Sequence, residues 1–229
     1  VLTYTIFEDS DVITRRATVY NDSTSSIRIK GLASAQLDLD ADEWKLVTFD
    51  GAWARERYMN ERALLPGIYI NDSKTGVSSA DHNPCIFLKK DDGECIGMNL
   101  VYSGNHRELV EVSPYGKIRV MTGINPATFS WELSPQDRFQ SPEAVLTYSH
   151  QGMNGASQNF HHFINNHIVR GTWKMRERPV LINNWEATYF NFNEDKLLNL
   201  AKESAALGIE LFVLDDGWFG FRNDDTTSL

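Results

Sequence analysis

The chain has 229 residues, of which 41% are hydrophobic and 23% charged, as is usual for proteins that fold around an apolar core in water. Its net charge is −9, and no basic stripe stands out from this acidic surplus, which argues against nucleic acid as a partner. No run of about 18 apolar residues occurs, so we expect no membrane span. The first residues, Val1-Leu2-Thr3-Tyr4, have the character of a strand interior, so we expect the chain to be part of a longer protein.

Residues 1 to about 150 consist of short segments rich in β-branched and aromatic residues, separated by Gly, Asn, Asp or Pro. This spacing predicts an antiparallel sandwich or barrel. We expect strands at 2–7, 12–20, 27–37, 44–49, 85–89, 95–102, 117–121, 128–133 and 144–148. The stretch 60–83 interrupts the pattern, and we expect it to cross a sheet edge or to carry function.

The two cysteines flank a turn at residues 90–93 whose Asp-Gly pair suits a two-residue hairpin loop. With such a loop, Cys85 would face Met98 and Cys95 would face Leu88. The thiols would then be too far apart for a disulfide, which requires Cα atoms within about 7 Å. We therefore expect two free thiols, which favour a reducing compartment and hence a cytoplasmic rather than a secreted parent protein.

From Ser157 the apolar residues follow a helical period. One stripe contains Phe160, Phe163, Ile164, His167 and Ile168, and Gly171 is expected to end the helix. Since His167 lies on this stripe, we interpret it as a packing residue rather than a ligand.

The next stretch predicts a βαβ unit. Residues 180–182 and 209–214 are apolar runs typical of strands buried on both faces. Between them, Asn193 is placed to cap a helix that Gly208 ends. The expected inner face of this helix contains Leu197, Leu198, Ala201 and Ala205. A connection of this length between two strands makes them parallel.

Acidic and aromatic residues follow both strands: Trp185-Glu186 after the first, and Asp215-Asp216-Gly217-Trp218 after the second. Ligands of such units bind at the carboxyl ends of the strands. Adjacent carboxylates on one backbone cannot flank a glycosidic bond as a catalytic pair, which needs a separation of about 5 Å or more. They can accept hydrogen bonds from neighbouring sugar hydroxyls, while Trp185 can stack on the apolar face of a sugar.

Three other interpretations stay open for these residues. Asp215-Asp216-Gly217 could form a helix cap and turn, and Trp185 and Trp218 could be core residues. Asp224-Asp225 could join the first pair in a cation site, although the spacing matches no calcium loop.

Long motifs in the chain resemble α-galactosidases of glycoside hydrolase family 36. NNWEATYF at 183–190 and LDDGWFG at 214–220 are similar to the start of that family's catalytic barrel. DGAWARER at 50–57, GINP at 123–126 and SPEAVLTYSHQGMNGAS at 141–157 are similar to its N-terminal domain. The resemblance covers nearly the whole chain.

The resemblance implies a mixed fold: an antiparallel β-supersandwich, incomplete at its start, followed by the first βαβ unit of a (β/α)8 TIM barrel. The expected domains are the sandwich at 1–156, a linker helix at 157–178 and the truncated barrel at 179–229.

The resemblance also implies an enzyme that removes terminal α-1,6-linked galactose from melibiose, raffinose and stachyose by a retaining double displacement. It assigns substrate binding to Asp215, Asp216, Trp185 and Trp53, the last of which would reach a neighbouring subunit's site in a homotetramer. The catalytic aspartates would lie beyond residue 229, so the chain alone should be inactive, and no cofactor or metal is expected.

Two alternatives differ from this interpretation. A related α-glycosidase, such as an α-N-acetylgalactosaminidase or a transglycosylase, could share the same motifs. A carbohydrate-binding module without chemistry is the second alternative, and the predicted parallel βαβ unit argues against it.

Overall fold

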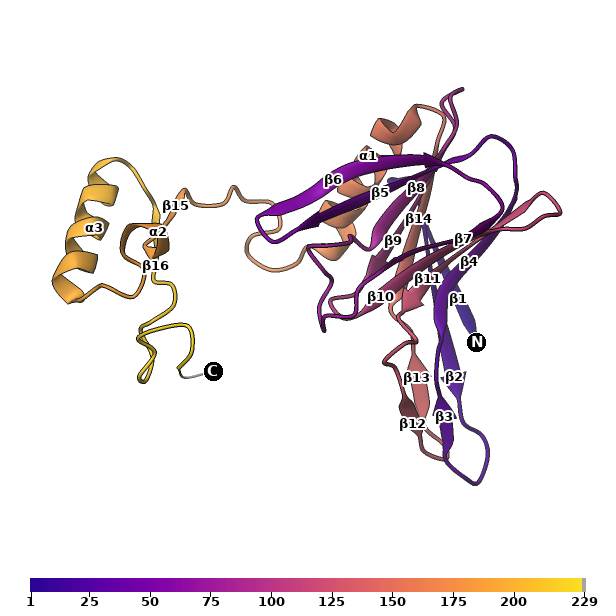
Figure 1. Cartoon of the computed structure of the whole chain (residues 1–229), viewed down its shortest axis with the longest axis horizontal. Coiled ribbons are helices and arrows are strands. Elements are labelled where there is room, and N and C mark those ends of the chain that lie inside the picture. The colour runs from indigo at the N-terminus through magenta and orange to yellow at the C-terminus, as the bar shows by residue number, and fades with distance from the viewer. Residues whose placement is uncertain (228–229) are drawn as a thin grey trace. The chain divides into compact units, whose positions relative to one another are not determined.

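The computed structural model describes residues 1–227 and divides into two units, Val1–Ile168 and Val169–Leu229, each described here by itself. The first unit contains mostly antiparallel strands and the second contains two parallel strands and two helices (Figure 1). None of the helices in the described part of the chain is long and apolar enough to cross a membrane.

The strands of the first unit are β1 (Leu2–Phe7), β2 (Val12–Tyr20), β3 (Ile27–Ile29), β4 (Ala33–Asp40), β5 (Lys45–Ala52), β6 (Arg55–Ala63), β7 (Gly67–Asp72), β8 (Cys85–Lys89), β9 (Cys95–Val101), β10 (His106–Val112), β11 (Lys117–Ile124), β12 (Trp131–Leu133), β13 (Arg138–Gln140) and β14 (Glu143–Ser149). They are followed by helix α1 (Gly152–Phe163), which continues into a π-helical segment, Ile164–Ile168. The second unit contains β15 (Leu181–Asn183), α2 (Trp185–Thr188), α3 (Glu194–Ala206) and β16 (Leu211–Val213).

Two sheets of the first unit enclose an apolar core. The larger has the order β1-β2-β14-β9-β8-β5-β6, with β13 also paired to β2, and the smaller has the order β4-β11-β10-β7. Alternate residues of both sheets point into the space between them, which is the arrangement of a sandwich. The buried core residues are Trp44, Leu46, Ile86, Leu88, Met98, Val110, Val112, Ile118 and Val120.

Helix α1 covers the other face of the larger sheet. Ala156, Phe160 and Phe163 of the helix pack against Phe87 and Val145 of the sheet. Gly97 allows this approach, since a Cβ there would lie 2.7 Å from the Phe160 ring. The helix begins at Gly152, five residues before the position predicted from the sequence, because Met153 and Ala156 extend the apolar stripe towards the N-terminus.

The interpretation of His167 as a packing residue is confirmed. Its ring centroid lies 4.6 Å from that of Phe7 and 5.6 Å from that of Phe163. Its Nε2 atom lies 3.0 Å from a carboxylate oxygen of Asp9, so the polar part of the ring also has a partner.

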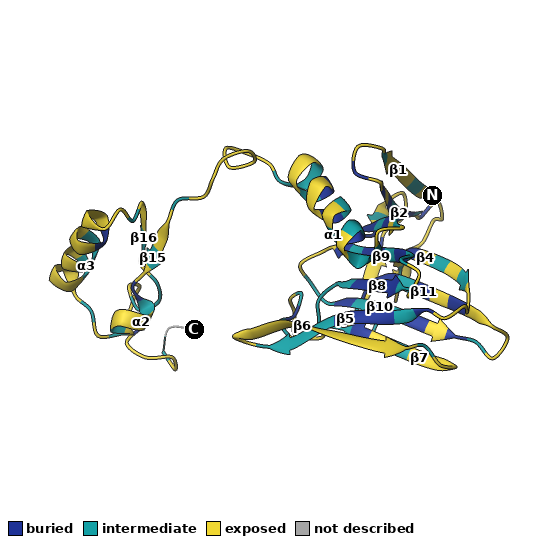
Figure 2. Ribbon diagram, turned by 90° about the horizontal axis from the view of Figure 1, so that it is seen from above, coloured by how far each residue is buried: buried dark blue, intermediate teal, exposed yellow. Residues whose placement is uncertain are grey.

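Four strands were not predicted, namely β6, β7, β10 and β13, and the predicted strand 27–37 is divided into β3 and β4. Strand β10 was missed because two residues on its buried face, His106 and Glu108, are polar. Strand β6 was missed because it is exposed along its whole length and therefore shows no alternation (Figure 2). The stretch 60–83 does cross between sheet edges, from β6 of one sheet to β7 of the other.

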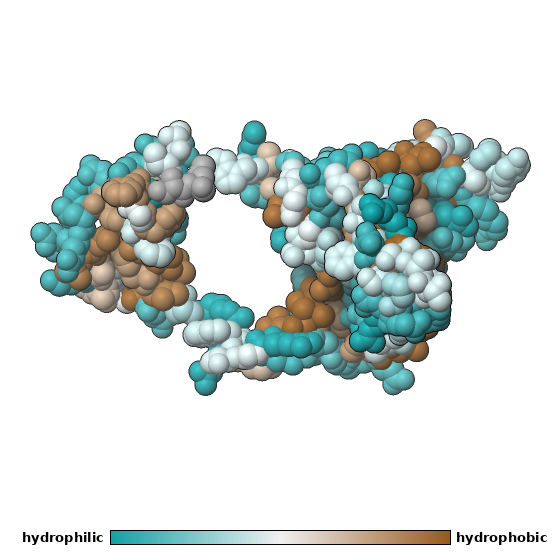
Figure 3. Space-filling model, turned by 90° about the horizontal axis from the view of Figure 1, so that it is seen from below, coloured by the Kyte–Doolittle hydropathy of each residue, from teal (hydrophilic) through white to brown (hydrophobic). Residues whose placement is uncertain are grey.

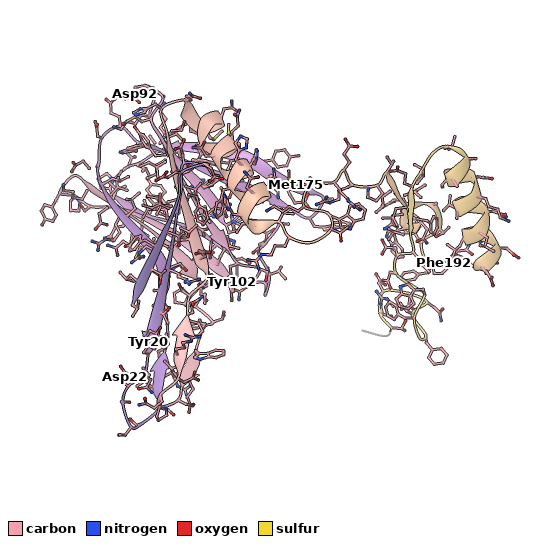
Figure 4. The ribbon with its side chains drawn as sticks, turned by 180° about the vertical axis from the view of Figure 1, so that it is seen from behind. Tyr20, Asp22, Asp92, Tyr102, Met175 and Phe192 are labelled. Atoms are coloured by element: carbon pink, nitrogen blue, oxygen red, sulfur yellow. The ribbon has the colours of Figure 1, made fainter. Side chains whose placement is uncertain are left out.

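The predicted register of the cysteine hairpin is wrong by one residue. Cys85 pairs with Asn99, and Cys95 with Lys89, because the loop contains three residues with Gly93 at a positive φ of 98°. Both thiols are nevertheless free, as expected. Asp92 of this turn lies at the opposite end of the first unit from Tyr20 and Asp22 (Figure 4).

The predicted βαβ order of the second unit is confirmed, since β15 and β16 pair in parallel and α3 connects them. The Asn193 side chain caps α3 by accepting the Lys196 N–H at 3.0 Å, and Gly208 follows the helix with a φ of 87°.

Two details of this unit differ from the prediction. The least exposed residues of α3 are Leu197, Leu200, Ala201 and Ser204, whereas Ala205 is exposed. Leu198 is also exposed, but with Leu197 and Ala201 it lines an open apolar hollow against Phe212 and Leu214, as its predicted place on the inner face implies. The strands are not buried on both faces: Leu181 and Leu211 are exposed, because a two-stranded sheet with one long helix leaves much of its apolar surface uncovered. Figure 3 shows apolar side chains gathered on the surface of this unit.

Candidate functional site

A buried asparagine joins the carboxyl ends of the two parallel strands. Asn184 directly follows β15 and is fully buried. Its Oδ1 atom accepts the Asp215 N–H at 2.8 Å, and its Nδ2 atom donates to Thr188 Oγ1 at 2.9 Å. Because one side chain binds the segments after both strands, it places Asp215 beside the β15 end. The sequence prediction did not include Asn184. The signal that could have identified it is its position directly after an apolar strand, where a polar side chain can bind the end of the neighbouring strand.

Asp215 is half-buried and accepts two hydrogen bonds. Asn183 Nδ2 donates to its Oδ2 atom at 2.5 Å, and the Asp216 N–H donates to its Oδ1 atom at 2.7 Å. A carboxylate has about four acceptor positions. Asp215 therefore keeps capacity for further donors, such as the hydroxyls of a ligand.

Asp216 forms a forked ion pair with Arg222. Arg222 Nε lies 3.0 Å from Asp216 Oδ1, and Arg222 Nη2 lies 2.8 Å from Oδ2. The hydrogen bond from Arg222 is the main cause that lowers the pKa of the Asp216 carboxyl below its usual value. The Gly217 N–H also donates to Oδ1 at 2.7 Å, and Arg222 Nε also lies 3.1 Å from Oδ2, so each oxygen of the Asp216 carboxylate has two donors.

The sequence prediction did not include Arg222. Its side chain is only 8% exposed and its Nη1 atom donates to the Thr227 carbonyl at 2.8 Å. Asp216 raises the pKa of Arg222 further above its already high usual value, so the pair stays charged. A lone arginine six residues after an aspartate gives no helical or strand spacing from which this pair could be inferred.

Trp185 opens α2 and is half-buried among aromatic rings. It packs edge to face on Phe190, with ring centroids 4.9 Å apart, and on Tyr189 at 5.4 Å. Its backbone N–H donates to Asn183 Oδ1 at 2.8 Å. Aromatic partners at the edge fix the orientation of an indole that can stack on a sugar.

Gly217 allows the segment after β16 to approach these rings. Its φ is 91°, and a Cβ atom would lie 3.0 Å from Phe190 and 3.1 Å from Phe192. Phe192 lies in the segment between α2 and α3 (Figure 4). The turn after Asp216 thus needs glycine both for its backbone conformation and for space.

Residues 217–227 contain no helix, so Asp215 and Asp216 do not cap one, while the predicted turn is present at Gly217. Trp218 is not a core residue in this unit, since it is 64% exposed. Among residues 1–227 there is no group of three or more His, Cys, Asp or Glu side chains that could hold a metal ion.

Trp53 belongs to the first unit. It lies in the turn between β5 and β6 and is 87% exposed. The next residue, Ala54, has a φ of 60°, and its N–H donates to Glu56 Oε1 at 2.9 Å. The turn therefore presents the indole to solvent.

Comparison with known proteins covers the whole chain. Residues 1–134 match the family model described as the glycosyl hydrolase family 36 N-terminal domain, and residues 138–229 match the model described as melibiase. The α-galactosidase AgaA of Geobacillus stearothermophilus is 45% identical over 100% of the chain. The chain spans about a third of the length of this relative, 32%.

Solved structures agree with these matches. The α-galactosidase from Lactobacillus brevis has a TM-score of 0.96 and 47% identity, and the match covers 100% of this chain and 31% of that one. A variant of AgaA in complex with stachyose has a TM-score of 0.95 and 45% identity, covering 100% of this chain and 32% of that one.

Proposed function

Because the chain belongs to glycosyl hydrolase family 36, we propose that it is part of an α-galactosidase and supplies a sugar-binding edge of the active site. It would comprise an incomplete β-supersandwich and the first βαβ unit of a (β/α)8 barrel at 179–229. The helix expected as a linker at 157–178 begins earlier, at Gly152, and its helical part ends at Ile168 while packed on the sandwich, so only residues 169–178 would link the two parts. One observation carries the proposal: Trp185, Asp215 and Asp216 gather at the carboxyl ends of two parallel strands. Ligands bind there in barrel enzymes.

The roles follow from the chemistry of each group. Asp215 and Asp216 would accept hydrogen bonds from adjacent galactose hydroxyls, and bonds to a charged acceptor are roughly twice as strong as neutral ones. Arg222 would keep Asp216 charged and fixed in place. Trp185 would cover the apolar face of the sugar.

The reaction of the whole protein would be hydrolysis of terminal α-1,6-linked galactose from melibiose, raffinose and stachyose, with retention. A retaining enzyme needs two carboxyls about 5–5.5 Å apart, one as nucleophile and one as acid and base. We expect both to be aspartates that follow residue 229 in the whole protein. The chain alone would then bind sugar weakly and catalyse nothing.

The whole protein would be a cytoplasmic homotetramer in which Trp53 reaches the active site of a neighbouring subunit. The position of Trp53 in an exposed turn supports this role, because an indole without a covering layer is available to another surface. The two free thiols support a reducing compartment.

Activity assays on the whole protein test the proposal. We expect hydrolysis of p-nitrophenyl α-galactoside and raffinose, with α-galactose as the first product seen by NMR. Faster hydrolysis of the N-acetylgalactosaminide would favour an α-N-acetylgalactosaminidase, and transfer of galactose to a sugar in preference to water would favour a transglycosylase. Sugar binding without any turnover would favour a carbohydrate-binding module.

A further inference from the structure

The β5–β6 hairpin, which carries Trp53 in its turn, is exposed on its outer strand. Every residue of β6 is exposed, and β6 forms the edge of the larger sheet (Figure 2). An edge strand without a covering layer is held mainly by its one neighbouring strand. The direction in which Trp53 projects therefore depends on contacts near the turn.

The carboxylate of Asp50, three residues before Trp53, joins three segments near this turn. Its Oδ1 atom lies 2.8 Å from Nδ1 of His82, which belongs to the loop between β7 and β8. Its Oδ2 atom accepts hydrogen bonds from Thr48 Oγ1 on β5 and from Asn60 Nδ2 on β6, both at 2.8 Å. One side chain thus connects both strands of the hairpin to the loop.

The backbone strengthens this connection. Asp50 and His82 form an isolated antiparallel bridge, in which the Gly51 N–H donates to the Asp81 carbonyl at 2.9 Å. At Gly51 the two strands of the hairpin approach closely, since a Cβ there would lie 2.2 Å from the Arg55 carbonyl oxygen. The loop therefore meets the hairpin directly before the turn that contains Trp53.

The loop is in turn fixed to the buried part of the smaller sheet. His106 Nε2 lies 3.1 Å from the His82 carbonyl oxygen, and His106 Nδ1 lies 2.9 Å from Glu108 Oε2. Asn71 Nδ2 donates to the Asn83 carbonyl at 2.7 Å and to Glu108 Oε2 at 2.8 Å. His106 and Glu108 are almost fully buried, so the anchor of the loop is well packed.

We propose that His82 and Asp50 are positioning residues, which hold the β5–β6 hairpin in the orientation that presents Trp53 to the sugar. The inference rests on the proposed role of Trp53 in substrate binding. His82 acts on Trp53 only through the hairpin, so its loss should weaken substrate binding and leave the chemical step unchanged.

Kinetics of the whole enzyme test this inference. We expect His82→Ala to raise KM for raffinose about three- to tenfold, the equivalent of losing one aromatic contact, with kcat nearly unchanged. His82→Asn should restore most of the wild-type KM, because its amide N–H can donate to Asp50 as Nδ1 does. The matched control is His162→Ala, at an exposed histidine on α1, which should change neither constant.

The double variant Trp53→Ala/His82→Ala separates a positioning role from an independent one. If His82 acts through Trp53, the double variant should have the KM of Trp53→Ala alone. Additive effects, an unchanged KM in His82→Ala, or an unchanged KM in Trp53→Ala would each overturn the inference.

Proteolysis tests the same connection without enzyme activity. Trypsin can cut after Arg55 and Arg57 on the hairpin, and after Arg176 in the second unit as an internal reference. In His82→Ala the cuts at Arg55 and Arg57 should become several times faster, while the cut at Arg176 keeps its rate. Unchanged hairpin cleavage would show that His82 does not hold the hairpin. An enzyme inactive on α-galactosides would reject the proposed function, and the cleavage rates would still decide whether His82 holds the hairpin.

Discussion

The guanidinium of Arg222 binds the carboxylate of Asp216 through two nitrogens, Nε at 3.0 Å and Nη2 at 2.8 Å, in the segment that follows the second parallel strand. The pair fixes both the position and the charge of the carboxylate. Since Arg222 is 8% exposed and Asp216 is 26% exposed at the side chain, the acid is the member of the pair that a ligand can reach.

Replacement of Arg222 by Met should lower activity most strongly at acidic pH. Arg222 depresses the pKa of Asp216, so the carboxylate stays charged above that lowered pKa and becomes protonated as the pH falls through it. Without Arg222 the pKa of Asp216 rises, and the acidic limb of the kcat/KM profile should shift to higher pH.

A pH–rate profile of the whole enzyme measures this shift. Arg170→Met, at an exposed arginine near the start of the second unit, is the control and should leave the profile unchanged. Identical acidic limbs in wild type and Arg222→Met would remove Asp216 ionisation from the mechanism.

Asp215→Asn and Asp216→Asn should impair catalysis more than folding. Each change keeps the shape but makes a charged acceptor neutral, which should lower kcat/KM about ten- to a hundredfold. Glucosides should be accepted no better than before, because loss of an acceptor creates no partner for a different hydroxyl. Asp225→Asn, at an exposed position nearby, is the control. Unchanged kcat/KM together with a lower melting temperature would make both aspartates structural.

Gly217→Ala should disturb the site more than Gly208→Ala. Both glycines have similar positive φ angles, 91° and 87°, so the backbone strain of a side chain is comparable. Only at position 217 would the new Cβ meet other atoms, at 3.0 Å from Phe190, whereas position 208 has open space. We therefore expect a larger loss of kcat/KM in Gly217→Ala. Equal losses, measured on both purified variants, would mean that the contact with the aromatic rings is unimportant.

The order of the elements in the second unit could be predicted because strands leave apolar runs in the sequence and helices leave capping residues at their ends. The run Val180–Ile182, the cap at Asn193 and the end at Gly208 each leave a local signal, and the structure has all three features. Strand β10 could not be predicted this way, because two polar residues, His106 and Glu108, occupy buried positions on it. They can be buried because they form a hydrogen bond with each other.

The residues of the candidate site also fall into two groups, those that could be recognised from the sequence and those that could not. The motifs around Trp185 and Asp215 are local in sequence and could be recognised. Asn184 and Arg222 could not, because their partners lie 31 and 6 residues away and are chosen by the tertiary structure. The helix cap considered for Asp215-Asp216-Gly217 is absent because no helix follows in residues 217–227, and Arg222 rather than helix N–H groups supplies most of the donors to Asp216.

The stability of the first unit should fall as the pH rises above neutrality. His106 Nδ1 faces a carboxylate and Nε2 faces a carbonyl, both of which only accept, so the geometry favours the doubly protonated ring. Burial lowers the pKa of His106, but the hydrogen bond to Glu108, the charge of Glu108 and the His82 carbonyl together raise it above its usual value.

The direction of the effect follows from this raised pKa. A histidine that binds its proton more tightly in the folded protein contributes its full stabilisation of the fold below its pKa in the unfolded chain, about 6.5. This contribution is lost as the pH rises through the pKa of the histidine in the folded protein. The free energy of unfolding from urea titrations should therefore decline above about pH 6.5, and His106→Gln should remove most of that decline. His162→Gln on the surface of α1 serves as the control and should keep it. A decline of the same size in His106→Gln would assign the effect to other groups.

The isolated chain should be inactive, and its second unit should exchange amide protons faster than its first. The nucleophile and the acid that we propose lie outside the chain, so purified 1–229 should not turn over p-nitrophenyl α-galactoside.

The two parallel strands pair only with each other among the described residues, and Leu181 and Leu211 are exposed, whereas β8 and β9 lie inside a larger sheet with a helix on one face. Local opening should therefore need less free energy in the second unit. Hydrogen exchange read by mass spectrometry should show fast exchange in 179–227 and slow exchange in 84–133. Similar protection of both segments would mean that the second unit is stable without the rest of the barrel, and turnover that scales with protein concentration would place a catalytic group inside these 229 residues.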